Sequence, residues 1–199
     1  QEDTDHATAA LADALSGGRR LTRSQALSTI NDAGVTTEGQ RGYHLLWYAA
    51  LTGVTCIGPQ FEGEQTFVLL DEWVANPRRL ESREAAAELA YRYFRSHGPA
   101  PVSDFAGWSG LGLRITRTAL SDNAGRLTSV TVHGEEMWLS TELANDRDEL
   151  RPQHRTVALP GFDELILGFK DRRLHIPEGR FDDIVPGGNG IFRSTIVSD

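Results

Sequence analysis

The densest group of charged and titratable side chains lies between residues 162 and 175. It combines carboxylates with several cations, a composition that suits a cleft for phosphate groups. In such a cleft the Asp171 carboxylate would orient the Arg172 guanidinium. A structural network of ion pairs uses the same residue types, so both interpretations stay open. The candidate residues in this segment are Asp163, Lys170, Asp171, Arg172, Arg173 and His175.

A glycine-rich stretch follows at residues 186–190, with the sequence Pro-Gly-Gly-Asn-Gly. Glycine adopts positive φ angles readily, so the stretch predicts a tight turn. Successive backbone N–H groups in such a turn can also cradle a phosphate. Asn189 in this turn and Arg193 just after it complete the candidate cleft.

Other site chemistries find little support in the sequence. The six histidines are scattered, without the spacings of a metal site, and neither a P-loop nor a dinucleotide-binding glycine motif is present. Ser109 follows Gly107-Trp108 but lacks the last glycine of a nucleophile elbow, so a helix–helix turn is the better interpretation. We therefore expect no metal and no cofactor, and we assign no catalytic residue.

The same order of elements, three helices and then a two-stranded hairpin, recurs over residues 5–72 and 82–141. This order is typical of a winged-helix module. In the first copy, Thr22 precedes Gln25 by three residues and Thr37 precedes Gln40 by three, which is the spacing of a capping box. The hairpin strands predicted for this copy are Val54–Ile57 and Thr66–Leu70.

The second copy has similar signals. Ser82 is the predicted N-cap of its first helix, and Gly98-Pro99 ends that helix. The following helices are predicted over residues 102–108 and 113–124. The alternating pattern of residues 126–133, a turn at Gly134 and a return strand over residues 135–139 complete the hairpin.

The third helix of each copy is where a recognition helix would enter the major groove of double-stranded DNA. Arginine and glutamine can hold phosphates or read base edges there. A merely solvated helix surface is the alternative. The candidate DNA-binding residues are Gln40, Arg41 and His44 in the first copy, Arg114, Thr116 and Arg117 in the second, and Lys170, Arg172 and Arg173 of the charged segment.

Residues 156–199 have a different texture, with short apolar runs such as Val157–Leu159 and Leu165–Leu167 between glycines and prolines. We interpret this as a β-rich region, the beginning of a β-barrel-like domain. The predicted fold class is thus α+β, with two tandem winged-helix modules followed by a partial barrel.

The net charge of −8 and a pI of about 5.2 argue against a general polyanion binder. DNA binding depends on local clusters of cations, so it is not excluded. No signal peptide and no bilayer-spanning run are visible, and we expect a cytoplasmic protein. Because the chain does not begin with Met, we expect it to be a fragment.

Two motifs carry a resemblance to a known family. They are residues 159–172, beginning Leu-Pro-Gly-Phe-Asp-Glu-Leu, and residues 185–197, beginning Val-Pro-Gly-Gly-Asn-Gly. Together with Asp104–Leu111 they resemble the bacterial winged-helix DNA-binding-domain family that includes the AlkZ-like DNA glycosylases. The resemblance implies three tandem winged helices and a β-barrel around a DNA channel, with the first winged helix missing here.

Characterised members of that family excise alkylated bases or unhook interstrand crosslinks. Their catalytic signature is a Q-x-Q or Q-x-D motif in the first winged helix, which we expect to lie outside this chain. The resemblance therefore implies a DNA-binding part of a glycosylase. A non-catalytic winged-helix DNA-binding protein and a protein-interaction scaffold are the alternatives.

Overall fold

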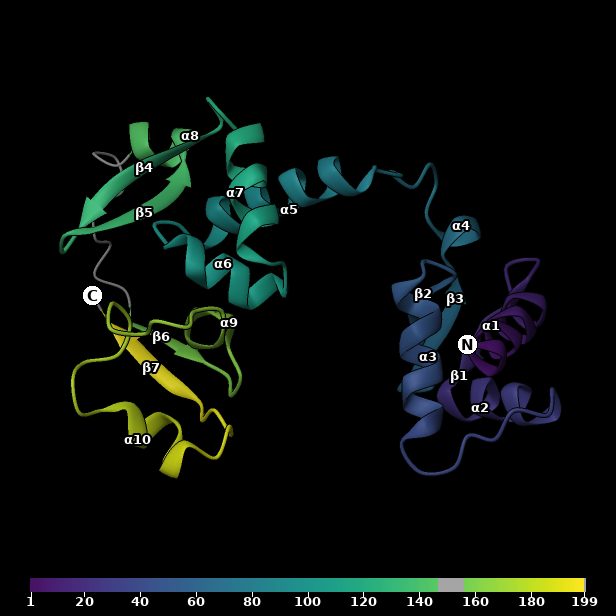
Figure 1. Ribbon diagram of the computed structural model, residues 1–199. Helices are drawn as coiled ribbons and strands as arrows, with labels where there is room; N and C mark the ends of the chain where they lie inside the picture. Colours follow the sequence, from purple (N-terminus) through teal and green to yellow (C-terminus); the bar gives the residue numbers. More distant parts are fainter. Residues whose placement is uncertain (147–155, 199) are drawn as a thin grey trace. The chain divides into compact units, whose positions relative to one another are not determined.

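The computed structural model describes residues 1–146 and 156–198 (Figure 1). The chain forms two compact units, Gln1–Arg79 and Leu80–Asp199. Each unit is described by itself below. Within the described residues, none of the helices has the length and the apolar character needed to cross a membrane.

The first unit packs three helices against a small antiparallel sheet. Helix α1 buries Ala7, Leu11 and Leu15, which repeat every four residues and so share one helix face. Ile30 and Phe67 meet this face in the core. The strand order is β1-β3-β2. The elements are α1 (Glu2–Leu15), β1 (Leu21–Thr22), α2 (Arg23–Asp32), α3 (Arg41–Leu51), β2 (Thr55–Phe61), β3 (Glu64–Leu69) and α4 (Leu70–Trp73).

Of the two predicted capping boxes, one is confirmed and one is wrong. The Thr22 hydroxyl accepts from the Gln25 backbone N–H, and the Gln25 side chain accepts from the Thr22 N–H. Gln40 makes no side-chain cap bond. Thr37 instead exchanges two hydrogen bonds with the Asn31 side chain, at 2.8 and 3.0 Å, and this contact with the end of α2 replaces the local cap.

The second unit begins with the same succession of three helices and a hairpin. Its core contains Tyr93 and Phe94 from the first of these helices, Phe105 from the second and Leu120 from the third. The helix predicted to have Ser82 as its N-cap has Glu81 there instead, so Ser82 is its first residue. The elements are α5 (Ser82–His97), α6 (Val102–Ser109), α7 (Leu113–Asp122), β4 (Leu127–Val132), β5 (Glu135–Ser140) and α8 (Thr141–Asp146).

The hairpin β4–β5 has a tight two-residue turn. His133 and Gly134 both have positive φ, 50° and 82°, as the twist of a two-residue hairpin requires. Val130 faces Met137 across the ladder. The predicted turn at Gly134 is thus confirmed.

The remaining part of the second unit differs from the predicted β-rich region. Strands β6 and β7 pair with each other in a two-stranded antiparallel sheet. The run Leu165–Leu167 lies in a short helix, because the Asp163 carboxylate accepts from the Leu165 N–H and caps it. The elements are β6 (Thr156–Leu159), α9 (Glu164–Leu167), α10 (Phe181–Ile184), the 3-10 turn η1 (Pro186–Gly188) and β7 (Thr195–Ser198).

The expected beginning of a barrel is therefore corrected. The described residues hold three separate open sheets, of three, two and two strands. The glycine-rich turn is confirmed, with positive φ at Gly187, Gly188 and Gly190. Phe169, from the segment after α9, packs into the same core as α5 and α7, so this region belongs to the second unit. A mixed α+β fold remains.

Candidate nucleic-acid interface

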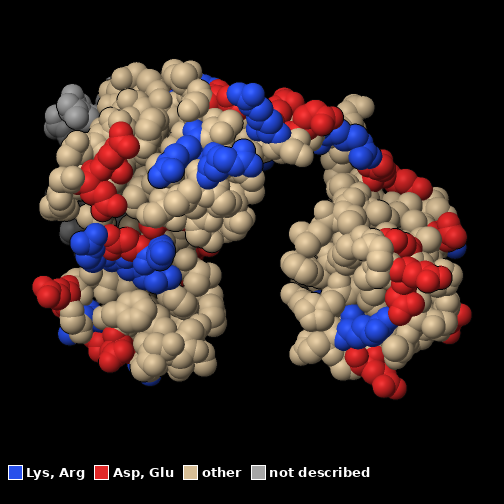
Figure 2. Space-filling view, viewed as in Figure 1, with Lys and Arg blue, Asp and Glu red and all other residues tan. Residues whose placement is uncertain are grey.

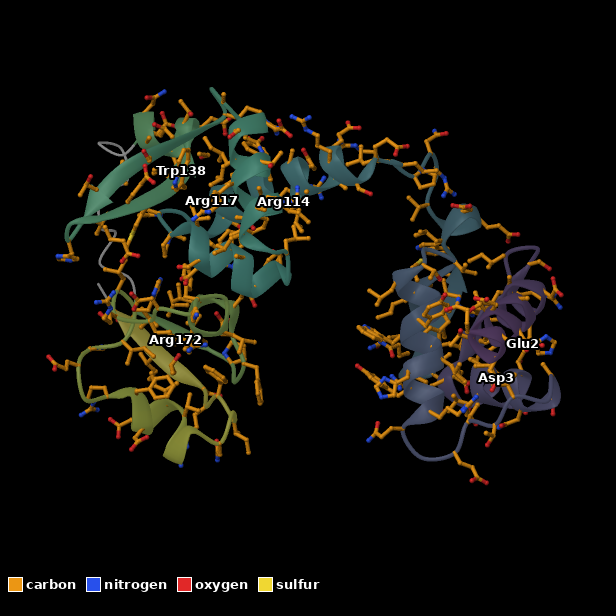
Figure 3. All side chains as sticks on the ribbon, viewed as in Figure 1. Glu2, Asp3, Arg114, Arg117, Trp138 and Arg172 are labelled. Carbon is orange, nitrogen blue, oxygen red and sulfur yellow. The ribbon has the colours of Figure 1, made fainter. Side chains whose placement is uncertain are left out.

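Helix α7 separates its apolar and cationic residues onto different faces. Thr116, Ala119 and Leu120 are buried, whereas Arg114 and Arg117 are exposed. Among the residues that the structure describes, no carboxylate lies within ion-pair distance of either guanidinium. Figures 2 and 3 show the two cationic groups over α7 on one visible face of the second unit. These two arginines are free to meet an anionic partner.

Thr116 does not belong with them. It is fully buried, and its hydroxyl donates to the Gly112 carbonyl 3.3 Å away. Successive residues of an α-helix are rotated by about 100° around the helix axis. Thr116 therefore faces the core although the arginines at positions 114 and 117 are exposed. Of the residues chosen from the sequence for this helix, only Arg114 and Arg117 are available to a ligand.

A groove of about 620 Å³ lies between α7 and the β4–β5 hairpin. Arg117 lines it from the helix, and Thr128, Ser129, Glu136 and Trp138 line it from the hairpin. Arg114 lines a different hollow of about 380 Å³, together with Arg83 and other residues of α5 and α7. The two free arginines therefore line two different hollows along the same helix.

Helix α3 of the first unit offers a different surface. Gln40, Arg41 and His44 are exposed, as predicted. However, the Arg41 guanidinium forms an ion pair with Asp3 of α1, which offsets its charge. The largest exposed side chain on this helix is aromatic, since Trp47 has 53% of its surface accessible.

The letters Q-x-D do occur in the chain, at Gln1-Glu2-Asp3, and our expectation that the motif lies outside it overlooked them. Both outer side chains are engaged. The Gln1 amide donates to Asp5 and to the Tyr48 hydroxyl, and Asp3 pairs with Arg41. These contacts attach α1 to α3, and we carry over no catalytic role to them.

The turn at residues 170–173 is ordered by a different ion pair from the one predicted. The Asp171 carboxylate accepts from the Arg173 guanidinium and backbone N–H, which lowers its pKa to about 2. Arg172 instead donates from Nε to the Ile166 carbonyl at 2.7 Å. Its guanidinium also lies 5.2 Å from the centre of the Phe192 ring. The expectation that Asp171 orients Arg172 is therefore wrong.

Lys170 is an exposed cation of this turn, and the described residues hold no carboxylate within ion-pair distance of it. Arg173 is exposed too, but it is shared between Asp171 and Glu135. A hollow of about 310 Å³ is lined by Lys170 and Arg172, with Asp104 and Trp108 from α6. Lys170 is thus the third free cation of the candidate interface.

The other predicted cleft residues make contacts within their own segment of the chain. Asp163 caps α9, the Asn189 side chain accepts from the Ile191 N–H at 2.9 Å, and Arg193 donates to the Asp183 carbonyl at 3.4 Å. His175 is half-buried and stacks on Phe169 with 4.1 Å between ring centres. Burial lowers the pKa of His175, while the Asp171 carboxylate acts in the opposite direction.

A polar cluster that the sequence did not single out joins α5 and α6 to α9. The Trp108 indole donates to Glu164 Oε1 at 2.8 Å, and His97 Nε2 lies 3.3 Å from the same oxygen. The ring of Tyr93 stacks on His97 at 4.5 Å, and its hydroxyl donates to the Gly168 carbonyl. Only Tyr93 and His97 are one helix turn apart. The three hydrogen bonds span 56 and more positions, so no local sequence signal predicts them.

Asp104 is the most deeply buried carboxylate near this cluster, with 2% of its surface exposed. Burial raises its pKa, although the backbone N–H groups of Asp171 and Lys170 face it and act in the opposite direction. Within the part of the chain that the structure describes, no group of three or more histidine, cysteine or acidic side chains could hold a metal ion. The second unit thus combines an apolar core and a buried polar cluster with unpaired cations on its surface.

A mixed α+β chain that exposes two arginines without ion-pair partners among its described residues shares these features with many nucleic-acid-binding proteins. Comparisons with known proteins identify its family. The family described as "DNA glycosylase AlkZ-like" matches residues 1–199. The chain belongs to the AlkZ-like DNA glycosylase family.

Two comparisons support the assignment. An interstrand DNA cross-link repair glycosylase of Streptomyces sahachiroi is 32% identical over 143 residues, which cover 66% of this chain and 37% of that protein. The solved structure of Streptomyces sahachiroi DNA glycosylase AlkZ has a TM-score of 0.78 and 25% identity, over 98% of this chain and 55% of the solved one. The chain thus spans about half the length of the solved relative, and its sequence match spans little more than a third of the cross-link repair glycosylase.

Proposed function

We propose that this chain holds double-stranded DNA within a repair glycosylase that acts on alkylated or crosslinked bases. The observation that carries the proposal is the pair of exposed arginines on α7, Arg114 and Arg117, neither of which has an ion-pair partner among the described residues. An unpaired surface cation is available to a phosphate, whereas a paired one must first give up its carboxylate. Family membership supplies the reaction class.

The proposal treats each three-helix and hairpin module as a winged helix. In that arrangement the third helix faces the DNA and the hairpin is the wing. Helix α7 has the position of the third helix, and β4–β5 follows it directly. Arg114 and Arg117 would then contact the backbone or base edges, with Lys170 as a further phosphate contact and Arg172 and Arg173 in supporting positions.

The acidic net charge is compatible with this role because many cations elsewhere are paired. Arg83 pairs with Asp122, and Arg92 pairs with Glu88. A DNA surface then depends on the few cations left without carboxylates. Screening by salt should weaken such binding steeply.

One observation favours a second candidate function, a protein-interaction surface on the first unit. Helix α3 has its only arginine paired with Asp3, while Tyr43 and Trp47 are each about half exposed. Aromatic side chains of this kind are frequent anchors in protein interfaces. Gln40 and His44 would in that case contact a protein and not DNA.

A salt titration of DNA binding tests the proposal. For a labelled duplex, the logarithm of the association constant decreases with the logarithm of the salt concentration. We expect the magnitude of this slope to decrease by about 2 when Arg114 and Arg117 are both replaced by alanine, since each phosphate contact contributes about 0.9. Arg92→Ala is the matched control, because that exposed arginine is paired with Glu88. A double variant with the affinity and slope of the wild type would contradict the proposal.

The repair activity needs a separate measurement. In the active protein, excision of an N7-alkylated base from duplex DNA should show a raised KM and a nearly unchanged kcat for the double variant, because a remote grip on DNA binds substrate and transition state alike. An equal fall in kcat and kcat/KM would instead place these arginines at the reacting sugar.

A further inference from the structure

Two arginines of the first unit reach the end of its β2–β3 hairpin where the chain turns. Strand β1 pairs antiparallel with β3, so the residues on either side of β1 lie beside this hairpin. Arg20 directly precedes β1 and Arg23 directly follows it. The Arg20 guanidinium lies over the Phe61 ring, 4.5 Å from its centre, and Arg23 Nη2 donates to Gln65 Oε1 at 3.1 Å. Both contacts hold a cation at the end of the hairpin.

Neither contact compensates the positive charge. Both arginines are exposed, and the described residues hold no carboxylate within ion-pair distance of either. The Phe61 ring covers one face of the Arg20 guanidinium, whereas the N–H groups lie in its plane and point away from the ring. Gln65 is neutral and occupies only one of the five N–H donors of Arg23. An anion at this end of the hairpin therefore meets two uncompensated guanidinium groups.

Helix α3 of the same unit presents a less favourable surface to an anion. The hollow of about 570 Å³ beside it is lined by Glu2 and Asp3 of α1 as well as by Arg41 and His44. Arg41 is the only arginine of this helix, and it is paired with Asp3. A phosphate near α3 would thus approach two carboxylates and a guanidinium that is already paired, and like charges repel.

We infer that the first unit contacts the phosphate backbone of duplex DNA with the end of its β2–β3 hairpin, through Arg20 and Arg23, and not with helix α3. The inference rests on the proposed function and assigns the face of the first unit that meets the nucleic acid. A guanidinium suits this contact because its planar N–H groups donate to two phosphate oxygens at once. The contact is independent of base sequence, since phosphates carry no sequence information.

Two carboxylates at the hairpin end limit the strength of this contact. Glu62 lies in the turn, and Glu64 faces Phe61 across the ladder. Both are exposed, so each repels a phosphate without being paired to Arg20 or Arg23. Removal of either negative charge should therefore strengthen DNA binding if this end of the hairpin faces the nucleic acid.

Duplex binding by the full chain over a range of salt concentrations tests the inference. With Arg20 and Arg23 both replaced by alanine, we expect affinity to fall about tenfold and the magnitude of the salt slope to decrease by about 2, since each phosphate contact contributes about 0.9. Replacing both by lysine keeps the charges and should retain the slope. Glu64→Gln should raise affinity about twofold.

Two further variants compare the hairpin with other surfaces of the first unit. Arg79→Ala removes an exposed arginine that is paired with Asp71, and it should bind DNA as the wild type does. Replacing Gln40 and His44 of α3 together by alanine should also leave affinity and slope unchanged. A larger loss from this α3 variant than from the alanine variant of the hairpin arginines would overturn the inference.

The remaining outcomes separate the inference from the proposed function. Thermal unfolding of each variant shows whether the first unit stays folded. If DNA affinity falls on replacement of Arg114 and Arg117 but not on replacement of Arg20 and Arg23, the inference is overturned while the proposed function stands. If the wild type does not bind duplex DNA, the proposed function fails and the inference fails with it.

Discussion

The indole N–H of Trp108 donates to Glu164 Oε1 at 2.8 Å, a contact that fastens α6 to α9 within the second unit. Glu164 also lies 3.3 Å from His97 of α5, so one carboxylate oxygen joins three helices. The basic turn at residues 170–173 follows α9 directly. Its position relative to the helical core therefore depends on this carboxylate.

Trp108→Phe should destabilise the second unit by about 1 kcal/mol, the usual net value of one hydrogen bond, because the Glu164 carboxylate is half exposed and water partly replaces the lost donor. Urea unfolding measures the change. Trp73→Phe, at an exposed tryptophan of α4 in the first unit, is the matched control and should leave the stability of the second unit unaltered. Equal effects of the two substitutions would argue against a structural role for the Trp108 contact.

Gly168→Ala should destabilise the same cluster more strongly, by about 1–3 kcal/mol, because there is no room for a methyl group. A Cβ at this position would lie 2.6 Å from His97 Nε2 and 2.8 Å from the Glu164 carbonyl. Gly107→Ala in α6 is the control, since a Cβ there meets nothing within 4 Å. Alanine has the higher helix propensity, so this control should be neutral or slightly stabilising in thermal unfolding.

Asn123→Asp should be more damaging than Asn123→Ala. The buried Asn123 amide donates to the carbonyls of Ala87 and Ala119, at 2.7 and 2.8 Å, and so ties α7 to α5. Alanine removes the donors, at a cost of about 1–3 kcal/mol, while a carboxylate adds repulsion from two carbonyl oxygens. The aspartate variant should regain stability as pH falls from 7 to 4, when the new carboxyl is protonated, and a flat profile would count against this arrangement.

Asp171 should contribute stability that depends on pH. Its folded-state pKa of about 2 lies below that of an unfolded aspartate, so its contribution is present above pH 4 and is lost as pH falls toward 2. The difference in urea-unfolding free energy between the wild type and Asp171→Asn should shrink over this interval. A difference that stays constant from pH 5 to pH 2 would mean that the pair with Arg173 adds nothing to folding.

Local signals in the sequence predicted local structure well. The Thr22–Gln25 capping box forms as expected because all its atoms lie within one helix turn. The hairpin turn at Gly134 likewise needs only its own backbone conformation. By contrast, Thr37 does not cap α3, because the side chain of Asn31 competes for its hydrogen bonds.

Residues of the candidate site could be predicted from the sequence only where the 3.6-residue repeat of a helix determines which side chains are exposed. Arg114 and Arg117 lie outside the core face of α7, whereas Thr116 was misassigned because exposure was inferred for the whole early turn. In the charged segment, the sequence supplied the right residues but the wrong pairing, since the Arg173 backbone and side chain both reach Asp171. The contact between Trp108 and Glu164 is set by tertiary packing, which residue spacing does not encode.

The pairing of β6 with β7 has a consequence for the segment between them. Thr156 faces Ser198 and Leu159 faces Thr195, so the pairing of the two strands holds the two ends of this segment together. Lys170 and the rest of the basic turn thus lie in a loop whose two ends are both fixed. Weaker pairing of β7 would increase the conformational freedom of Lys170, far from it in sequence, and a substitution at Ile196 is therefore expected to affect the proposed phosphate contact of Lys170.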